Sequence, residues 1–387
     1  MKQMQRNIQS TPTLPDSATQ ELLGRTPIPI DMQSIREKMQ GKVVLVTGAA
    51  GSIGSEICSQ IAACAPGALI GFDQAEKPIF HLQRGLAKEF PELAFHAEIG
   101  SLTRFEDVDR VFNRYHPSIV FHAAGLKHVP LMERHVFATV ENNLFGTCIA
   151  AEAAAANGAE CFIKVSTDKA VLPTSVIGAT KRAAELALVA MQKSTGTKFA
   201  SVRLGNVLGS SGSASTVFAE QIAAGGPLTV TYPAMERYFM TLRESSQVVL
   251  YAASVCQGGE IFVPELGTPV KVLDLAEKLI RLLGREPHCE IRIEFTGARP
   301  GEKLSEHLSL PQQALTSTKQ PEIRTISSAG DLDLYRLRDF RKTLQRAIGL
   351  HDRKRVVEFL TQMVPEYIPA PEHLENTAAT GASRKTQ

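Results

Sequence analysis

The chain has 387 residues, of which 43% are hydrophobic and 21% charged, and its formal net charge is +2. This length can bury a large core, and so small a charge excess argues against the clustered basic surface of a nucleic-acid-binding protein. The six cysteines include no Cys-x-x-Cys pair, so we expect buried free thiols and no metal site. The sequence has no run of ~18 apolar residues and no signal peptide, which favours a cytoplasmic protein without a membrane span.

The first strongly apolar segment ends in a glycine-rich turn. Residues 1–20, rich in Gln, Ser, Thr and Pro, are expected to be a disordered tail, and residues 21–41 form a lead-in. Residues 42–47 are a nearly continuous run of β-branched and aliphatic residues, which predicts a strand buried on both faces. The turn therefore opens directly from the carboxyl end of a buried strand.

The spacing of the glycines in this turn is typical of a dinucleotide-binding loop. Gly48 permits the tight turn, Gly51 lets the backbone approach a pyrophosphate, and Gly54 lets helix and strand pack closely. The free N–H groups at the start of the next helix, around Ser52 and Ile53, would then hold the phosphates.

An acidic residue follows at the distance that a dinucleotide site requires. Residues 68–72 predict a second strand, and Asp73 comes directly after it, 19 residues past Gly54. A carboxylate here accepts hydrogen bonds from the adenosine ribose hydroxyls and disfavours a 2′-phosphate. We therefore expect NAD as the cofactor, rather than NADP.

Strands and helices continue to alternate along the chain. The strands are expected at residues 95–99, 117–122, 161–165 and 199–204, and the helices around residues 105–115, 140–157 and 181–193. This alternation predicts an α/β fold, a Rossmann-type doubly wound parallel sheet with a smaller C-terminal substrate lobe.

The domain boundaries follow from where this rhythm loosens. We expect the NAD-binding domain with its lead-in at residues 21–205, the substrate lobe, interleaved with returns to the main sheet, at 206–368, and a second disordered tail at 369–387. Residues 331–363 have the pattern of basic amphipathic helices, for which a solvated face is favoured over a binding patch.

The chemistry is expected between Ser166 and Lys181. Here an apolar-leaning strand ends in a polar cluster that contains Thr167, Asp168 and Lys169, and Lys181 opens an Ala- and Leu-rich helix. In a parallel sheet such a cluster lies at the carboxyl edge, where ligands bind.

Several blocks of the sequence resemble the extended short-chain dehydrogenase/reductases, and within them the nucleotide-sugar 4,6-dehydratases of polysaccharide biosynthesis. The glycine loop with Asp73 carries the first resemblance. The second rests on the blocks His122-Ala-Ala-Gly-Leu-Lys-His-Val-Pro130, Ser166-Thr-Asp-Lys169, Arg203-Leu-Gly-Asn206-Val-Leu-Gly209, Arg237-Tyr-Phe-Met-Thr241 and Arg299-Pro-Gly-Glu-Lys303. The similarity covers residues 21–368 and is closest to the soluble half of the large membrane-anchored members.

The resemblance implies a reaction of NAD with a UDP-N-acetylhexosamine, most favourably UDP-N-acetylglucosamine. Hydride leaves carbon 4, water is eliminated across carbons 5 and 6, and hydride returns to carbon 6. By this resemblance Thr167 hydrogen-bonds the oxygen on carbon 4, Asp168 protonates the leaving hydroxyl and Lys169 is the base at carbon 5. Lys181 holds the nicotinamide ribose. Lys169 needs a lowered pKa to act as a base, and we expect Lys127 or Lys181 to supply the neighbouring charge.

The resemblance also assigns binding contacts, and Asn143 is interpreted as a helix or water-network residue rather than a ligand. The remaining cofactor contacts are Ser101 and Ala123, and the substrate contacts are Lys127, His128, Asn206, Arg237, Arg299 and Glu302. Among these, a structural role for His128 is as plausible as a catalytic one, and Arg299 is expected to clamp a diphosphate.

Three positions depart from the family pattern. Ile177 stands where most short-chain dehydrogenases have a Tyr, four residues before the active-site Lys. Ser101 stands where the family has an Asp on the adenine, and Ser211 where it usually has an Arg.

These departures leave other functions open. The alternative to a nucleotide-sugar dehydratase is a dehydratase of an unusual substrate without a diphosphate, such as a nucleoside or nucleoside monophosphate. A nucleotide-sugar epimerase is less favoured, because simple epimerisation at carbon 4 gives Lys169 no task, and a cofactor-binding scaffold is least favoured. We also expect a homo-oligomer that pairs through the helices near residues 140–157 and 181–193.

Overall fold

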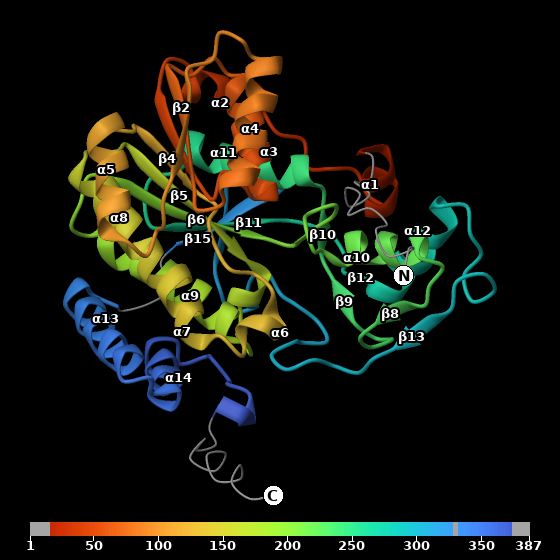
Figure 1. Ribbon diagram of the computed structural model, residues 1–387. Helices are drawn as coiled ribbons and strands as arrows, with labels where there is room; N and C mark the ends of the chain where they lie inside the picture. The colour runs from red at the N-terminus through yellow and green to blue at the C-terminus, as the bar shows by residue number, and fades with distance from the viewer. Residues whose placement is uncertain (1–15, 328–331, 374–387) are drawn as a thin grey trace, which may run out of the picture.

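The computed structural model describes residues 16–327 and 332–373 (Figure 1). Within these residues, nine strands form one sheet in the order β14-β15-β11-β6-β5-β4-β1-β2-β3. The strands are β1 (Val43–Thr47), β2 (Ala68–Asp73), β3 (Phe95–Ile99), β4 (Ile119–His122), β5 (Cys161–Thr167), β6 (Lys198–Leu204), β11 (Glu260–Pro264), β14 (Leu315–Ser317) and β15 (Ile323–Ser327).

The sheet is parallel from β3 to β11, and the direction of strand order reverses between β1 and β4. β15 joins β11 in antiparallel orientation, and β14 joins β15 in the same way. The predicted Rossmann-type doubly wound sheet is therefore confirmed. In such a sheet the binding crevice lies at the carboxyl ends of the strands on either side of the reversal.

Helices cover both faces of the sheet (Figure 1). One face is packed by α2 (Met32–Met39), α3 (Ser52–Ala62) and α11 (Leu242–Val255). The other is packed by α5 (Phe105–Tyr115), α8 (Gly146–Ala156) and α9 (Val176–Gln192). α4 (Glu76–Glu89) packs beside β2, β3 and α3.

The C-terminal helices form a further layer outside α9. α13 (Leu334–Gly349) and α14 (Arg353–Met363) pack on α9 and contribute to its hydrophobic core, rather than to the smaller lobe in whose range they were placed. Every residue of α9 from Val176 to Met191 is consequently buried by its own chain. The helix expected to pair with a second copy is thus covered within its own chain, and the expected homo-oligomer stays a prediction.

The smaller lobe has a hydrophobic core of its own and lies on the right in Figure 1. It contains α1 (Asp16–Leu23), α10 (Ala214–Ala223), α12 (Val272–Leu282), β8 (Leu228–Val230), β9 (Glu236–Arg237), β12 (Val270–Lys271) and β13 (Ile293–Phe295). The short pair of β7 (Asn206–Val207) and β10 (Phe239–Met240) leads into it from β6.

Both expected tails are shorter than the composition suggested. Residues 16–20 belong to α1, whose Leu22 and Leu23 are buried in the core of the small lobe. Residues 371–373 form a short 3-10 helix, and His373 is buried. Local composition missed both segments because packing stabilises such short helices. The rest of the predicted tails, residues 1–15 and 374–387, lies outside the described residues.

The cysteines and the lengths of the helices can also be compared with the sequence-based expectations. All six cysteines are free, and all but Cys289 are buried, as expected. No helix among the described residues has the length and apolar character needed to cross a membrane.

A lysine is buried in the middle of the sheet. Lys164 on β5 is 0% exposed, and its ammonium has one long hydrogen bond, 3.5 Å to the carbonyl of Val165. Burial, with the nearby charges of Lys181 and Arg203, holds the pKa of Lys164 well below its ordinary value. Folding at neutral pH therefore costs free energy, because Lys164 must either lose its proton or bury its charged ammonium.

We predict that Lys164→Met raises the free energy of unfolding at pH 7 by about 1–4 kcal/mol. The folded state binds fewer protons here than the unfolded state, so wild-type stability rises with pH between 7 and 10, and the variant should lose part of that slope. Chemical denaturation across this pH range measures both effects. An unchanged slope with lower stability would show that Lys164 is not neutral in the fold.

Candidate active site

The glycine turn forms the floor of a groove at the carboxyl edge of the sheet. Gly48 has φ +68°, and Gly51 caps α3. A Cβ atom on Gly54 would lie 2.0 Å from the carbonyl oxygen of Gly48, so helix and strand approach as closely as the sequence predicted. The groove holds about 590 Å³ of empty space and is lined by Gly48, Gly51, Phe72, Asp73, Gln74, Gly100, Leu102, Ala123, Ala124, Gly125, Leu126 and Asn142.

Asp73 joins the end of β2 to the glycine turn. One of its oxygens accepts a hydrogen bond from the backbone N–H of Ala50 (3.0 Å), and the other accepts one from Ala75 (3.0 Å). The carboxylate is thus fixed in the groove beside Gly48 and Ala123. This is the position from which a ribose diol can be bound.

Five of the predicted cofactor residues lie outside the groove lining: Ser52, Ile53, Gly54, Ser101 and Lys181. Ser101 donates its backbone N–H to Asp107 (3.0 Å) and hydrogen-bonds Thr103, while its neighbours Gly100 and Leu102 face the groove. Ser52 and Ile53 form the first turn of α3, and Ser52 Oγ accepts the backbone N–H of Ser211 (3.0 Å). That these residues contact the cofactor stays a prediction.

Thr167, Asp168 and Lys169 come together where β5 ends. Asp168 is completely buried, and its Oδ1 accepts hydrogen bonds from Thr167 Oγ1 (2.9 Å) and Lys169 Nζ (2.9 Å). Its Oδ2 accepts a longer bond from Asn206 Nδ2 (3.4 Å). The structure therefore brings these four predicted residues into one cluster around a buried carboxylate.

The pKa of Lys169 is shifted in the direction opposite to our expectation. Burial alone would lower its pKa, but the carboxylates of Asp168 and Glu306 outweigh burial and raise the pKa above the ordinary value. Lys127 and Lys181, expected to lower the pKa of Lys169, are not the charges that act on it. Glu306, whose Oε1 lies 3.8 Å from Lys169 Nζ, is a site residue that sequence reasoning missed.

Lys181 lies in the second turn of α9, which begins five residues earlier than predicted because Ser175 caps it by accepting the N–H of Gly178 (3.1 Å). Lys181 Nζ donates to the carbonyl of Val165 (3.3 Å) and lies against Gly125 in the groove lining. Burial lowers the pKa of Lys181 to about 8, although Glu185 opposes the shift. Lys181 therefore links the groove lining at Gly125 to the backbone of β5 at Val165.

A buried ion pair between Glu185 and Arg203 connects α9 to the strands β5 and β6. Glu185 on α9 accepts two hydrogen bonds from Arg203 on β6 (3.0 and 2.8 Å) and one from Ser166 on β5 (2.6 Å). Burial would raise the pKa of Glu185, but Arg203 and then Arg182 lower it to about 2. The carboxylate is thus permanently charged and ties one helix to two strands.

The departure at Ile177 and the interpretation of Asn143 can now be compared with the structure. Ile177 packs with Val129 and Met132 in a small apolar cluster, so no hydroxyl replaces the missing Tyr at that position. The helix between residues 136 and 156 is interrupted by a π-helical turn, Glu141–Phe145, in which Asn143 bonds both backbone groups of Leu126. Asn143 thereby shapes the groove, in agreement with its interpretation as a helix residue.

The predicted substrate residues form two groups. Lys127 donates to the carbonyl of Ser211 (2.7 Å), and a Cβ on Gly212 would lie 2.6 Å from the His128 ring, so these residues meet the loop that lacks the expected Arg. Asn206 reaches Asp168, as described above.

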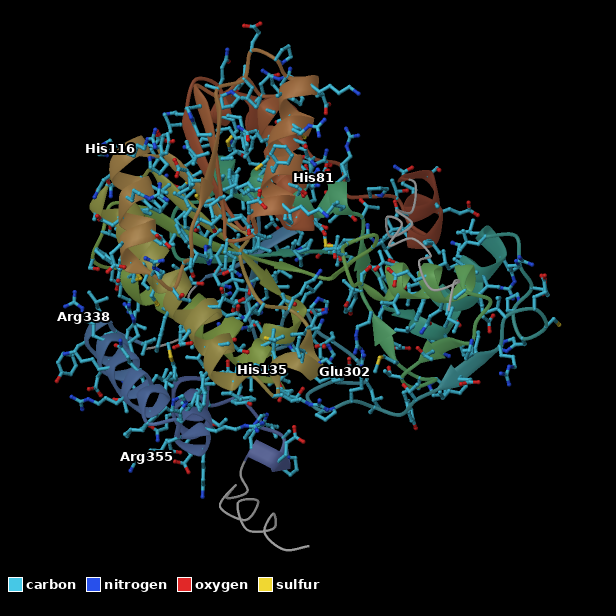
Figure 2. All side chains as sticks on the ribbon, viewed as in Figure 1. His81, His116, His135, Glu302, Arg338 and Arg355 are labelled. Atoms are coloured by element: carbon cyan, nitrogen blue, oxygen red, sulfur yellow. The ribbon has the colours of Figure 1, made fainter. Side chains whose placement is uncertain are left out.

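The second group lies on the segment that returns from the small lobe. Arg299 is exposed and pairs with Glu302 (3.0 and 2.6 Å), which Figure 2 shows on the segment below α6 (Val129–Met132). Arg237 is buried and donates to the carbonyls of Lys303 (2.8 Å) and Leu304 (3.1 Å). Arg237 therefore holds the backbone of residues 303–304, whereas the guanidinium of Arg299 is open to solvent.

Comparison with known proteins identifies the family. A family model described as "Polysaccharide biosynthesis protein" matches residues 44–328. The chain belongs to this family. EpsC of Bacillus subtilis, a probable polysaccharide biosynthesis protein, is 47% identical over 76% of this chain and 49% of EpsC. The chain thus spans about half the length of that relative. A UDP-glucose 4-epimerase of Rickettsia rickettsii is 32% identical over 69% of this chain and 77% of the epimerase.

Solved structures share the fold. Pen from Bacillus thuringiensis has a TM-score of 0.68 and 31% identity, with 77% of this chain and 90% of Pen covered. DesIV of Streptomyces venezuelae, a dTDP-glucose 4,6-dehydratase with NAD bound, has a TM-score of 0.61 and 19% identity, with 78% and 98% covered. These similarities confirm the predicted resemblance to the extended short-chain dehydrogenase/reductases.

We predict that Gly54→Ala destabilises the protein by about 3 kcal/mol or more, because its Cβ has no room beside the Gly48 carbonyl. Gly85→Ala is the matched control: Gly85 lies within α4, and nothing lies within 4 Å of the position that an added methyl group would take. The control should gain about 0.5–1 kcal/mol. Thermal unfolding and dinucleotide titration of both variants measure this, and equal stability would contradict the close approach.

Proposed function

We propose that this chain is an NAD-dependent dehydratase of a nucleotide sugar, acting most favourably on UDP-N-acetylglucosamine. The observation that carries the proposal is the hydrogen-bonded pair of Asp168 and Lys169 at the end of β5, with Thr167 on the same carboxylate. An adjacent acid and base fit an elimination, in which one bond partner is protonated and a neighbouring carbon loses a proton.

The groove fits a dinucleotide. Its floor is the backbone turn of Gly48 and Gly51, and Asp73 is fixed at its edge, which favours NAD over NADP. Lys181 lies against Gly125 of the groove lining and bonds the Val165 carbonyl on β5, so it would hold the nicotinamide ribose. When bound there, NAD would accept the hydride from carbon 4 and return it at carbon 6.

The protons of Asp168 and Lys169 balance over such a reaction. In the resting pair one proton is held by the Lys169 ammonium, 2.9 Å from Asp168 Oδ1. Its transfer breaks an N–H bond, forms an O–H bond, and leaves a neutral amine and carboxyl. Asp168 then protonates the hydroxyl that leaves carbon 6, while Lys169 takes the proton of carbon 5 and the C–H electrons form the new double bond. This restores the ion pair.

Completion of the reaction needs one more proton at carbon 5, which the Lys169 ammonium is placed to donate. The proton released by the oxidised hydroxyl on carbon 4 replaces it, so the site gains and loses none over the cycle. Thr167, now bonded to Asp168, would turn its hydroxyl to the oxygen on carbon 4. Because an ammonium exchanges its protons with water, deuterium from solvent should appear at carbon 5.

An epimerase is the second candidate, because the Rickettsia rickettsii relative is named as one. Epimerisation at carbon 4 moves a hydride off and back at one carbon and needs no base at carbon 5. Lys169 would then serve only as a partner of Asp168. The alternative without a diphosphate would be favoured instead if calorimetry found equal binding of a nucleoside and its UDP-linked counterpart.

We predict that Lys169→Met reduces exchange of deuterium into carbon 5, and product formation, by about 10²-fold or more, because the base is lost. NAD should still bind, since Lys169 is not in the groove lining. Lys193→Met, at the exposed C-terminal end of α9, is the matched control and should behave as wild type. Nuclear magnetic resonance of the sugar in deuterated water measures the exchange. Undiminished exchange in Lys169→Met would remove the proposal.

A further inference from the structure

Glu306 is a buried carboxylate that the reaction outlined above does not use. Its side chain is 3% exposed, its Oε1 lies 3.8 Å from Lys169 Nζ, and its Oε2 lies 2.6 Å from Lys303 Nζ. Although Lys303 is close, the geometry gives Oε2 no directed hydrogen bond among the described residues. A buried carboxylate with so little hydrogen bonding costs stability, which points to a task in the site.

Asp168, Lys169, Glu306 and Lys303 form a row of alternating charges. The first two lie at the end of β5, and the other two lie on the segment that returns from the small lobe. Lys303 Nζ also donates to the carbonyl of Val171 (2.8 Å), and Arg237 binds the backbone carbonyl of Lys303 (2.8 Å). The row is therefore anchored on both the main sheet and the small lobe, and Glu306 cannot move away from Lys169 independently.

We propose that Glu306 is a positioning residue of this site, which holds the Lys169 ammonium with a second carboxylate and sets how readily Lys169 passes its proton to Asp168. The inference rests on the proposed function, because it concerns the same proton. Without Glu306, Asp168 would be the one carboxylate left to hold the Lys169 ammonium, and Lys169 would give up its proton more readily. Glu306 stabilises the protonated form of Lys169 until substrate binding weakens their interaction. Lys303 pairs with Glu306 and so limits the attraction of Glu306 for Lys169.

The charges around Lys169 support these roles of Glu306 and Lys303. The charged groups that act on Lys169 are Asp168 on its own turn, Glu306 on the returning segment and Arg237 on β9, with Lys303 behind Glu306. Burial lowers the pKa of Lys169, and Asp168 followed by Glu306 reverses that effect. Removing the Glu306 charge should therefore let burial and Arg237 prevail.

The test measures the proton of Lys169 without any substrate. The full-length protein is labelled with acetic anhydride over a pH series, and residue-resolved mass spectrometry follows Lys169, whose side chain is 22% exposed. In Glu306→Gln, the pH at which Lys169 becomes reactive should fall by roughly 1–3 units, the effect of one opposite charge at this distance. In Lys303→Gln it should stay at least as high as in wild type, because Glu306 is then no longer neutralised.

Glu302→Gln is the matched control, because Glu302 lies on the same segment but pairs with Arg299 and not with Lys169. It should leave the reactive pH of Lys169 unchanged. Equal reactivity of Lys169 in wild type and Glu306→Gln, or a fall of the same size in Glu302→Gln, would overturn the proposal. Thermal unfolding of each variant shows whether it is folded. If Glu306→Gln does not fold, Lys303→Gln still tests the proposal, because a fall of the reactive pH of Lys169 in that variant would contradict it.

A kinetic measurement separates this inference from the proposed function. With a nucleotide sugar that turns over, the basic limb of kcat/KM against pH should move to lower pH in Glu306→Gln, while KM changes little. If no sugar turns over, the proposed function fails, and the labelling result still decides whether Glu306 controls the Lys169 proton. A labelling shift together with an unmoved basic limb would overturn the role of Glu306 in catalysis.

Discussion

The site depends on the buried carboxylate of Glu185. This one group bonds Ser166 at the end of β5 and Arg203 on β6, and it lies one helical turn beyond Lys181 on α9. A buried pair of this kind adds little net stability, but loss of one partner leaves a costly unpaired charge. The relative position of β5 and α9 is therefore fixed, and with it the distance between the Thr167 cluster and the Lys181 ammonium.

The two lobes meet through the segment that returns from the small lobe to the main sheet. Arg237 holds its backbone, Lys303 reaches across to the loop after Lys169, and Glu306 faces Lys169 itself. Binding of a nucleotide between the lobes, where Arg299 is exposed, would act on the same segment. Under the proposed function, substrate binding would then be linked to the proton on Lys169 through Lys303 and Glu306.

The sequence predicted the parts of the molecule whose signals are local. Gly48, Gly54 and Asp73 lie where a dinucleotide loop requires them, because strand, turn and helix follow each other directly. Contacts between distant segments could not be read in this way. Glu306 reaches Lys169 only through the fold, and its carboxylate, together with that of Asp168, reverses the expected effect on the Lys169 pKa. For the same reason the composition of residues 16–20 suggested a tail, although α1 packs in the core of the small lobe.

The central claim is that the Asp168–Lys169 pair removes water from a nucleotide sugar, rather than serving an epimerisation at carbon 4. The decisive measurement is the mass of the sugar product after incubation of the protein with NAD and UDP-N-acetylglucosamine. Dehydration predicts a product lighter by the mass of one water molecule. A product of unchanged mass, with an inverted hydroxyl at carbon 4, would contradict the claim and establish the epimerase instead.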